Sequence, residues 1–256
     1  MQAQLRTIKP STSDIEPREA ASITLHRFAP FFGTPDASPF VIKAMLLLAF
    51  AGLPYRAVPG DIFKAPKKFL PYVEDAGETV ADSALIRRHL ERKYDIDFDT
   101  GLGAAQRATA WAIERMCEDH LYFALLEMRW LDRDNFRNGV GTVFDALPFL
   151  LRPFVKQLLL RANRARLHGH GLGRHVKADI AELAIRDIDA LASLIADKPY
   201  LMSDRPCGAD AFVFGIITAI LTPPLESPLR SAIARHANLV AYRDRLTRRY
   251  FPELAT

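Results

Sequence analysis

A Leu-Pro pair and, further along the chain, an acidic residue followed by serine are the features of this sequence that suggest binding chemistry. Proline cannot donate to a β-ladder and sits at the first residue or the edge of a strand, and Pro71 directly precedes a β-prone run. If the Leu70-Pro71 bond is cis, the main-chain N–H and C=O of Leu70 face outward and are free for a peptide ligand. Asp82 or Ser83 then opens a helix, where free N–H groups and the helix dipole favour a carboxylate. Together the two features predict a receptor for a short acidic peptide.

Short strands and a helix must hold these residues. Residues 72–73 and 79–80 are β-prone, and residues 74–78 between them form a hairpin connection. Residues 23–28 and 55–58 also have the composition of strands. The helix behind the cap is indicated by apolar residues at helical spacing, which are Leu85, Ile86 and Leu90.

Ser38 and Pro39 mark a second helix start. Serine suits the N-cap and proline suits the first helical position. The pattern predicts a helix to about Ala51, with Gly52 just past its end. The helix is apolar on nearly every side, Lys43 being the exception, so we expect it to be buried against a sheet.

The succession Leu-Pro-Tyr-Val, hairpin, acid and serine resembles the glutathione-binding half of the glutathione transferases. In that family the residue before a cis-proline pairs with the cysteinyl backbone of glutathione, and the acid–serine pair holds the γ-glutamyl end. The resemblance implies these roles for Leu70 with Pro71 and for Asp82 with Ser83. Lys68, just before the Leu-Pro step, would meet the glycyl carboxylate, although a solvated loop lysine is the alternative.

Ser38 is the catalytic candidate, because it occupies the place where this superfamily carries its Ser or Cys. The thiolate of glutathione is the nucleophile, and a hydroxyl at a helix N-terminus supplies a dipole and a hydrogen bond to the sulfur. The alternatives are that Ser38 only caps the helix, or that Thr34 is the active hydroxyl. Cys117 is the first cysteine of the chain, so no mixed disulfide with glutathione can form in the first half. We therefore expect addition of the thiolate to an electrophile rather than thiol–disulfide exchange.

The electrophile would lie between the loop of residues 29–37 and the helix predicted over residues 102–130. Aromatic side chains there favour an apolar substrate, although core packing would use the same residues. Those available are Phe31, Phe32, Trp111 and Tyr122. Lys43 is open to two interpretations, neutralisation of a thiolate or of a second anionic ligand, or extension of its ammonium to the surface.

The composition is that of a soluble globular protein, with 256 residues, 49% hydrophobic and 25% charged. The uncharged stretch 211–225 has 15 residues and two prolines, which is short of the roughly 20 apolar residues that span a membrane. Cys117 and Cys207 follow no metal or redox spacing. We expect a cytoplasmic protein, because a reducing compartment suits free thiols.

The net charge is +4, and basic residues cluster in residues 161–177 and 243–249. Residues 161–177 contain no Phe, Tyr or Trp, so nucleic-acid binding is not expected. The charge is compatible with anionic ligands and with peripheral contact to a membrane surface. The histidine spacing in this segment matches no zinc pattern, so no metal site is expected; the histidines are His168, His170 and His175.

The predicted fold is α+β, with two domains arranged as in glutathione transferases. Residues 1–22 are polar and are expected to be disordered. Residues 23–96 are expected to form a thioredoxin-like domain with a four-stranded mixed sheet. From residue 102 the patterns are helical, and residues 102–253 are expected to form an all-helical domain.

The second half resembles the branch of this superfamily that contains failed-axon-connections proteins and metaxins. The segments that carry this resemblance include residues 118–122, 171–175, 198–201, 210–215 and 238–240. The first hypothesis for function is a glutathione-dependent transferase, a homodimer, that conjugates glutathione to a small apolar electrophile. The second is a non-catalytic binding or adaptor protein on the same fold, as the metaxin resemblance implies, and a third is a protein that only stores glutathione.

Overall fold

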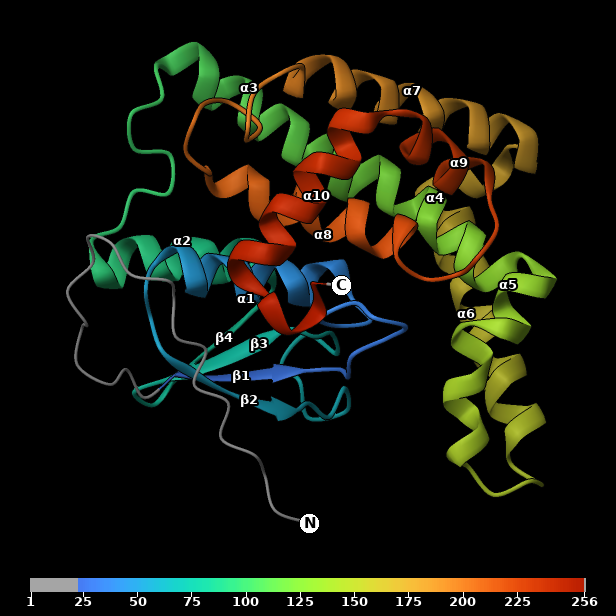
Figure 1. Ribbon diagram of the computed structural model, residues 1–256. Helices are drawn as coiled ribbons and strands as arrows, with labels where there is room; N and C mark the ends of the chain where they lie inside the picture. Colours follow the sequence, from blue (N-terminus) through green and yellow to red (C-terminus); the bar gives the residue numbers. More distant parts are fainter. Residues whose placement is uncertain (1–22, 256) are drawn as a thin grey trace.

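The computed structural model describes residues 23–255. The disorder expected for residues 1–22 lies outside this range. Four strands form one mixed sheet in the order β2-β1-β3-β4, in the lower part of Figure 1. They are β1 (Ile23–Arg27), β2 (Tyr55–Pro59), β3 (Tyr72–Asp75) and β4 (Glu78–Ala81). β1 runs parallel to β2 and antiparallel to β3, which is antiparallel to β4, so the predicted mixed sheet is confirmed.

Two helices, α1 (Pro39–Phe50) and α2 (Ser83–Tyr94), lie between the sheet and the helical part of the molecule (Figure 1). α1 begins where Ser38 and Pro39 predict, and most of its residues are buried. Its burial follows from its composition, because a helix that is apolar all round must be covered on all sides. Gly52 follows the helix with a φ of 64°, a backbone angle that glycine adopts without strain.

The remaining elements are helical, and most of them lie on the far side of α1 and α2 from the sheet (Figure 1). The bounds are α3 (Ala104–Met116), α4 (Tyr122–Leu126), α5 (Arg133–Asn138), α6 (Arg152–His170), α7 (Lys177–Ile195), α8 (Gly208–Leu221), α9 (Pro228–Arg235) and α10 (Ala237–Tyr250). Two π-helical segments, η1 (Cys117–Leu121) and η2 (Glu127–Leu131), continue α3 and α4 into one long run. The long helix predicted over residues 102–130 is therefore present, and η1 marks an irregularity at His120. Three 3₁₀ segments complete the order, η3 (Val140–Ala146), η4 (Leu172–Arg174) and η5 (Pro252–Leu254).

α8 is the central helix of the second half, and each of its residues is buried. Its first turn is held by the Asp210 carboxylate, which accepts the Cys207 N–H at 2.7 Å and the Leu201 N–H at 2.9 Å. α8 packs directly on α1. A Cβ atom added at Gly215 would lie 2.8 Å from the carbonyl oxygen of Pro39, so only glycine permits this approach.

One part of the molecule extends away from the rest. The segment from η3 into the first turns of α6 projects as a helical hairpin at the lower right of Figure 1. Across residues 23–255, no helix is both long and apolar enough to cross a membrane.

Candidate active site

Ser38 lies at the N-terminus of α1 with an extended backbone (φ −104°, ψ 124°). Its hydroxyl makes no capping hydrogen bond and has no hydrogen-bond partner among the described residues. The side chain is half-buried. Ser38 thus occupies the N-cap position without capping the helix through its hydroxyl, and this hydroxyl is available to a ligand at the positive end of the helix dipole.

The loop before Ser38 is fixed by Thr34 and Asp36, both fully buried. The Thr34 hydroxyl lies 2.7 Å from the carbonyl oxygen of Phe31 and 2.8 Å from that of Asp36, so it serves the loop and is not free for a sulfur. The Asp36 carboxylate accepts the Ser38 N–H at 3.0 Å and faces Arg27 at 3.1 Å. Burial raises the pKa of Asp36 to about 7, although the Ser38 N–H and Arg27 oppose the rise.

Arg129, on η2, holds the same loop from the helical side. Its guanidinium donates to the carbonyl oxygen of Ala37 at 2.8 Å and to that of Ala219 on α8 at 2.7 Å, and it lies over the Phe31 ring. Burial lowers the pKa of Arg129 to about 10. The partners of Arg129 in this contact lie about 90 residues away in the chain, so local sequence patterns give no sign of it.

The Leu70-Pro71 peptide bond is cis. The Leu70 side chain packs against Gly60, where an added Cβ would lie 2.5 Å from it. Within the part of the chain that the structure describes, no hydrogen bond uses the main-chain N–H or C=O of Leu70. The Pro71 carbonyl accepts the Asp82 N–H at 3.3 Å, so the Leu-Pro pair and the start of α2 are neighbours.

The start of α2 is shaped by Asp82 and Ser83. Asp82 has φ 88° and ψ 128°, and its carboxylate caps the helix by accepting the Ala84 N–H at 2.9 Å. A positive φ at a non-glycine residue costs about 1–3 kcal/mol and is concentrated at functional sites. Ser83 is 2% exposed, and its N–H and hydroxyl have no hydrogen-bond partner within residues 23–255. The N–H and hydroxyl of Ser83 are therefore free for a ligand at this helix start.

The two lysines considered from the sequence have other partners. Lys68 is exposed, has a positive φ and donates to the carbonyl oxygen of Phe63 within its own loop. Lys43 is fully buried and lies 2.6 Å from Glu114 and 2.7 Å from Glu118. Both interpretations of Lys43 are therefore wrong: it neither reaches the surface nor faces the Ser38 loop as a free cation.

Further charged residues surround Lys43, Glu114 and Glu118. Arg87 on α2 lies 3.0 Å from Glu114 and 2.7 Å from Asp99, and Arg115 pairs with Glu118. The ion pairs thus join α1, α2 and α3. His120, another polar residue of this helical run, pairs with Asp187 on α7.

His168 and His170 lie at the end of α6, and His175 follows η4. α6 continues to His170, whose ring stacks on Phe123 at 3.6 Å. Among the described residues no three His, Cys, Asp or Glu side chains are close enough to hold a metal ion.

An aromatic cluster around Arg166 connects the two parts of the site. The Arg166 guanidinium lies 5.4 Å from the ring centres of Tyr122 and Phe123 and 5.6 Å from that of Phe69. Tyr122 also meets Phe40 edge-on at 4.7 Å. Phe40 follows Ser38 by two residues and Phe69 directly precedes Leu70, so the cluster flanks both predicted elements of the site.

Of the four aromatics predicted to line this region, Tyr122 belongs to the cluster. Phe31 is buried under Arg129, Phe32 stacks edge-on against Phe31, and the exposed Trp111 lies under Arg115. Phe69 and Arg166 were not predicted. The one signal for Phe69 was its position beside Leu70.

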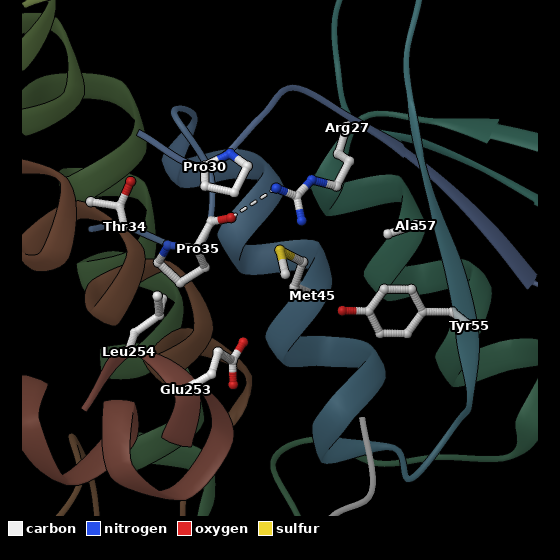
Figure 2. A pocket seen from close by; sticks show the side chains of 9 residues that line it. All are labelled: Arg27, Pro30, Thr34, Pro35, Met45, Tyr55, Ala57, Glu253 and Leu254. Atoms are coloured by element: carbon white, nitrogen blue, oxygen red, sulfur yellow. Dashed lines mark hydrogen bonds between the residues drawn. The ribbon is translucent and has the colours of Figure 1, made fainter. Parts of the chain in front are cut away.

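A separate cavity of about 40 Å³ lies behind the Ser38 loop. In Figure 2 the Arg27 guanidinium and the Tyr55 hydroxyl face it, while Glu253 and Leu254 of η5 close the other side. A polar cavity of this size admits water. The cavity is distinct from the surface between Ser38, Leu70 and Ser83.

Comparison with known proteins shows the family of this chain. A family model described as the glutathione S-transferase N-terminal domain matches residues 39–135, and one for the C-terminal domain matches residues 184–246. The isoprene-epoxide–glutathione S-transferase of Rhodococcus sp. (strain AD45) is 30% identical over 238 residues, which are 89% of this chain and 99% of that protein. The chain belongs to the glutathione S-transferase family.

Two further relatives of this family member carry names that do not mention glutathione. Failed axon connections from Drosophila melanogaster is 29% identical over 90% of this chain and 58% of its own length. Metaxin-3 from Xenopus laevis is 24% identical over 86% of this chain and 74% of its own length. The resemblance to this branch is thereby confirmed.

Solved structures show the same transferase fold. The beta-etherase LigF from Sphingobium sp. strain SYK-6 has a TM-score of 0.64 at 16% identity, over 91% of this chain and 98% of that one. Rice GST1, solved in complex with glutathione, has a TM-score of 0.59 at 15% identity, over 90% of this chain and 88% of that one.

Proposed function

We propose that this protein conjugates the thiolate of glutathione to a small apolar electrophile, with an epoxide as the first class to examine. The epoxide comes from the name of the Rhodococcus relative. The observation that carries the proposal is the Ser38 hydroxyl, which lies at the N-terminus of a buried helix with no hydrogen-bond partner among the described residues. A hydroxyl in that position donates to a thiolate and lowers the pKa of the thiol.

The binding surface fits the peptide part of glutathione. Leu70 offers a main-chain N–H and C=O that no described residue uses, as an extended peptide requires for pairing. The start of α2 offers the N–H and hydroxyl of Ser83, which suit the γ-glutamyl carboxylate. The second Asp82 carboxylate oxygen suits the adjacent amino group. Lys68 can bind the glycyl carboxylate once its ammonium gives up the hydrogen bond to the Phe63 carbonyl oxygen.

The aromatic cluster provides the surface for the electrophile. Phe40, Phe69 and Tyr122 present rings beside the two elements of the site, and apolar rings favour a small apolar substrate. As the sulfur–carbon bond forms, a carbon–oxygen bond of the epoxide breaks, and the oxygen keeps the electron pair. The oxygen then takes up a proton from water, which balances the proton that the thiol released to water when the thiolate formed. The Tyr122 hydroxyl and the Arg166 guanidinium are the donors in the cluster that stabilise this developing negative charge.

A second candidate is a binding or adaptor protein without turnover, which the failed axon connections and metaxin relatives favour. The partnerless Ser38 hydroxyl supports the enzyme, because an adaptor does not need a group that acts on sulfur. For either function we propose a homodimer in the cytoplasm. The location rests on Cys117 and Cys207, which are both unpaired thiols.

The test combines calorimetric titration with glutathione and mass spectrometry of a reaction with glutathione and a small epoxide. The proposal expects binding to the wild type and a thioether product that forms faster than without protein. Ser83→Ala should weaken binding about tenfold or more, since a hydrogen bond to a charged group contributes about 1.5–3 kcal/mol. Ser203→Ala is the matched control, because Ser203 lies in an exposed turn of the helical part and bonds to Arg205.

The outcomes separate the candidates. Binding with thioether formation supports the transferase, and binding without product for epoxides and aryl halides favours the adaptor or storage role. No binding of glutathione, or equal affinity in Ser83→Ala and the wild type, would overturn the assignment of the site.

A further inference from the structure

The hairpin that projects from the molecule carries a concentration of exposed apolar side chains. Phe149, Leu150 and Phe154 are 78%, 76% and 75% exposed, and Val143, Leu151 and Leu158 are also more than half exposed. These six residues lie within residues 143–158, at the far end of the hairpin in Figure 1. Single exposed apolar residues are ordinary, but a contiguous group of them marks an interaction site. We call residues 143–158 the hairpin tip.

The apolar side chains form one stripe where α6 begins. Leu151, Phe154 and Leu158 follow at spacings of three and four residues, which places them on one helix face. The same spacing continues to Arg161, which is exposed. A helical face that changes from apolar to basic along its length is therefore presented outward.

The charge of this region is mainly positive, and Asp145 is the one acidic residue of the hairpin tip. Residues 146–178 contain seven Lys or Arg and no Asp or Glu. Arg161 and Arg164 are exposed and form no ion pair or hydrogen bond with any described residue. Lys156, by contrast, reaches Asp145 at 3.3 Å. The hairpin thus has an apolar end and, further along α6, positive charges that no acidic residue neutralises. This combination is complementary to a surface with an apolar interior and anionic groups at its boundary with water.

We propose that the hairpin tip docks the protein on a membrane surface that contains anionic lipids. Arg161 and Arg164 follow Phe154 by seven and ten residues, which is about 10–15 Å along a helix at 1.5 Å per residue. Apolar side chains of interfacial helices insert about 5–10 Å, so the two arginines reach the level of the lipid phosphates when Phe149 and Phe154 are inserted. A second copy of this chain is a poorer occupant, because two such faces would bring like charges together.

The test measures co-sedimentation of the full chain with vesicles of phosphatidylcholine alone and with 30% phosphatidylserine. The wild type should bind the anionic vesicles, and binding should fall with added salt. Phe149→Ser with Phe154→Ser should lower the partition coefficient at least tenfold. Arg161→Ala with Arg164→Ala should lower it about fivefold per residue, because a basic residue near an anionic surface contributes about 1 kcal/mol.

Matched controls separate the hairpin from general effects. Phe63→Ser removes an aromatic ring that is 85% exposed elsewhere, and Arg88→Ala with Arg235→Ala removes two exposed charges far from the tip. Both controls should bind as the wild type does. In Phe149→Trp, the fluorescence emission of the introduced tryptophan should shift to shorter wavelength when anionic vesicles are added.

Three results would overturn the proposal. The first is no binding of the wild type to anionic vesicles, and the second is equal loss in the hairpin and control variants. The third is a wild-type dimer that becomes monomeric in Phe149→Ser with Phe154→Ser while vesicle binding is unchanged, which would make the tip a contact between copies.

Discussion

The Arg129 guanidinium donates to the carbonyl oxygen of Ala37 at 2.8 Å, one residue before Ser38. The same guanidinium donates to Ala219 in the middle of the second half. One side chain therefore fixes the main chain that leads into the catalytic candidate, and fixes it to the central helix α8.

Arg129→Met should lower both stability and turnover. The substitution leaves two carbonyl oxygens without their donor, and an unsatisfied buried polar group costs about 1–3 kcal/mol. We expect a loss of roughly 3 kcal/mol in urea unfolding and a fall in kcat that exceeds the change in glutathione affinity. Arg133→Met, at an exposed position, is the control. A normal kcat in a folded Arg129→Met would show that the loop needs no support from η2.

Ser38→Ala should act on the sulfur more than on the peptide. Loss of a hydrogen bond to the thiolate, at about 1.5–3 kcal/mol, should lower kcat about tenfold or more and raise the pKa of the bound thiol. The measurement is thiolate absorbance of the glutathione complex at neutral pH, beside steady-state rates. Thr34→Val is the matched variant, because its hydroxyl serves main-chain carbonyls. If Thr34→Val loses the thiolate signal and Ser38→Ala keeps it, the catalytic assignment moves to Thr34.

Asp36 should make stability fall as pH rises. Its pKa is about 7 in the folded protein and about 3.8 in the unfolded chain, so the folded state binds more protons between these values. Stability is then lost between about pH 4 and pH 7, by at most about 4 kcal/mol at about 1.4 kcal/mol for each pKa unit. The difference between Asp36→Asn and the wild type, measured by urea unfolding at several pH values, isolates this residue.

The Asn variant should gain stability relative to the wild type as pH rises through this window, and the gain should level off above pH 7. Asp134→Asn, at an exposed acid on α5, should show no such trend. A difference curve for Asp36→Asn that is flat from pH 4 to pH 8 contradicts the shifted pKa.

Lys43→Met should destabilise the protein strongly, because it leaves Glu114 and Glu118 buried without the ammonium between them. Removing one partner of a buried ion pair costs about 3–5 kcal/mol. The free energy of unfolding in urea is the measurement. Adding Glu118→Gln to Lys43→Met should recover part of the loss, since one buried charge is then removed, and no recovery would show that packing governs the position.

The local features of the site were predictable because each is a signal of adjacent residues. Ser38 with Pro39 marks a helix start, and Asp82 with Ser83 marks another, and the structure has both. The cis bond at Leu70 was a condition that the sequence left open. The order of strands and helices followed from the same kind of local pattern.

The long-range features were not predictable, because their partners lie far away in the chain. Lys43 meets its carboxylates 71 and 75 residues later, and Arg129 meets Ala37 across 92 residues. An apolar helix with one lysine is equally compatible with a lysine at the surface and with a buried one. A lysine can be buried only if another helix places a carboxylate beside it, and the sequence of the first helix does not contain that information. The position of Arg166 over three rings was not predictable for the same reason, because Phe69, Tyr122 and Phe123 are all far from it in the sequence.

The absence of a side chain at Gly215 has a consequence for recombination between relatives. Because α8 approaches the Pro39 carbonyl so closely there, the sequence of one half limits what the other half accepts. A chimera that joins residues 1–100 of this chain to the second half of a relative with a larger residue at this position would push the first turn of α1, and with it Ser38, out of place. Exchange between such proteins should succeed where the contacting surfaces of α1 and α8 are transferred together.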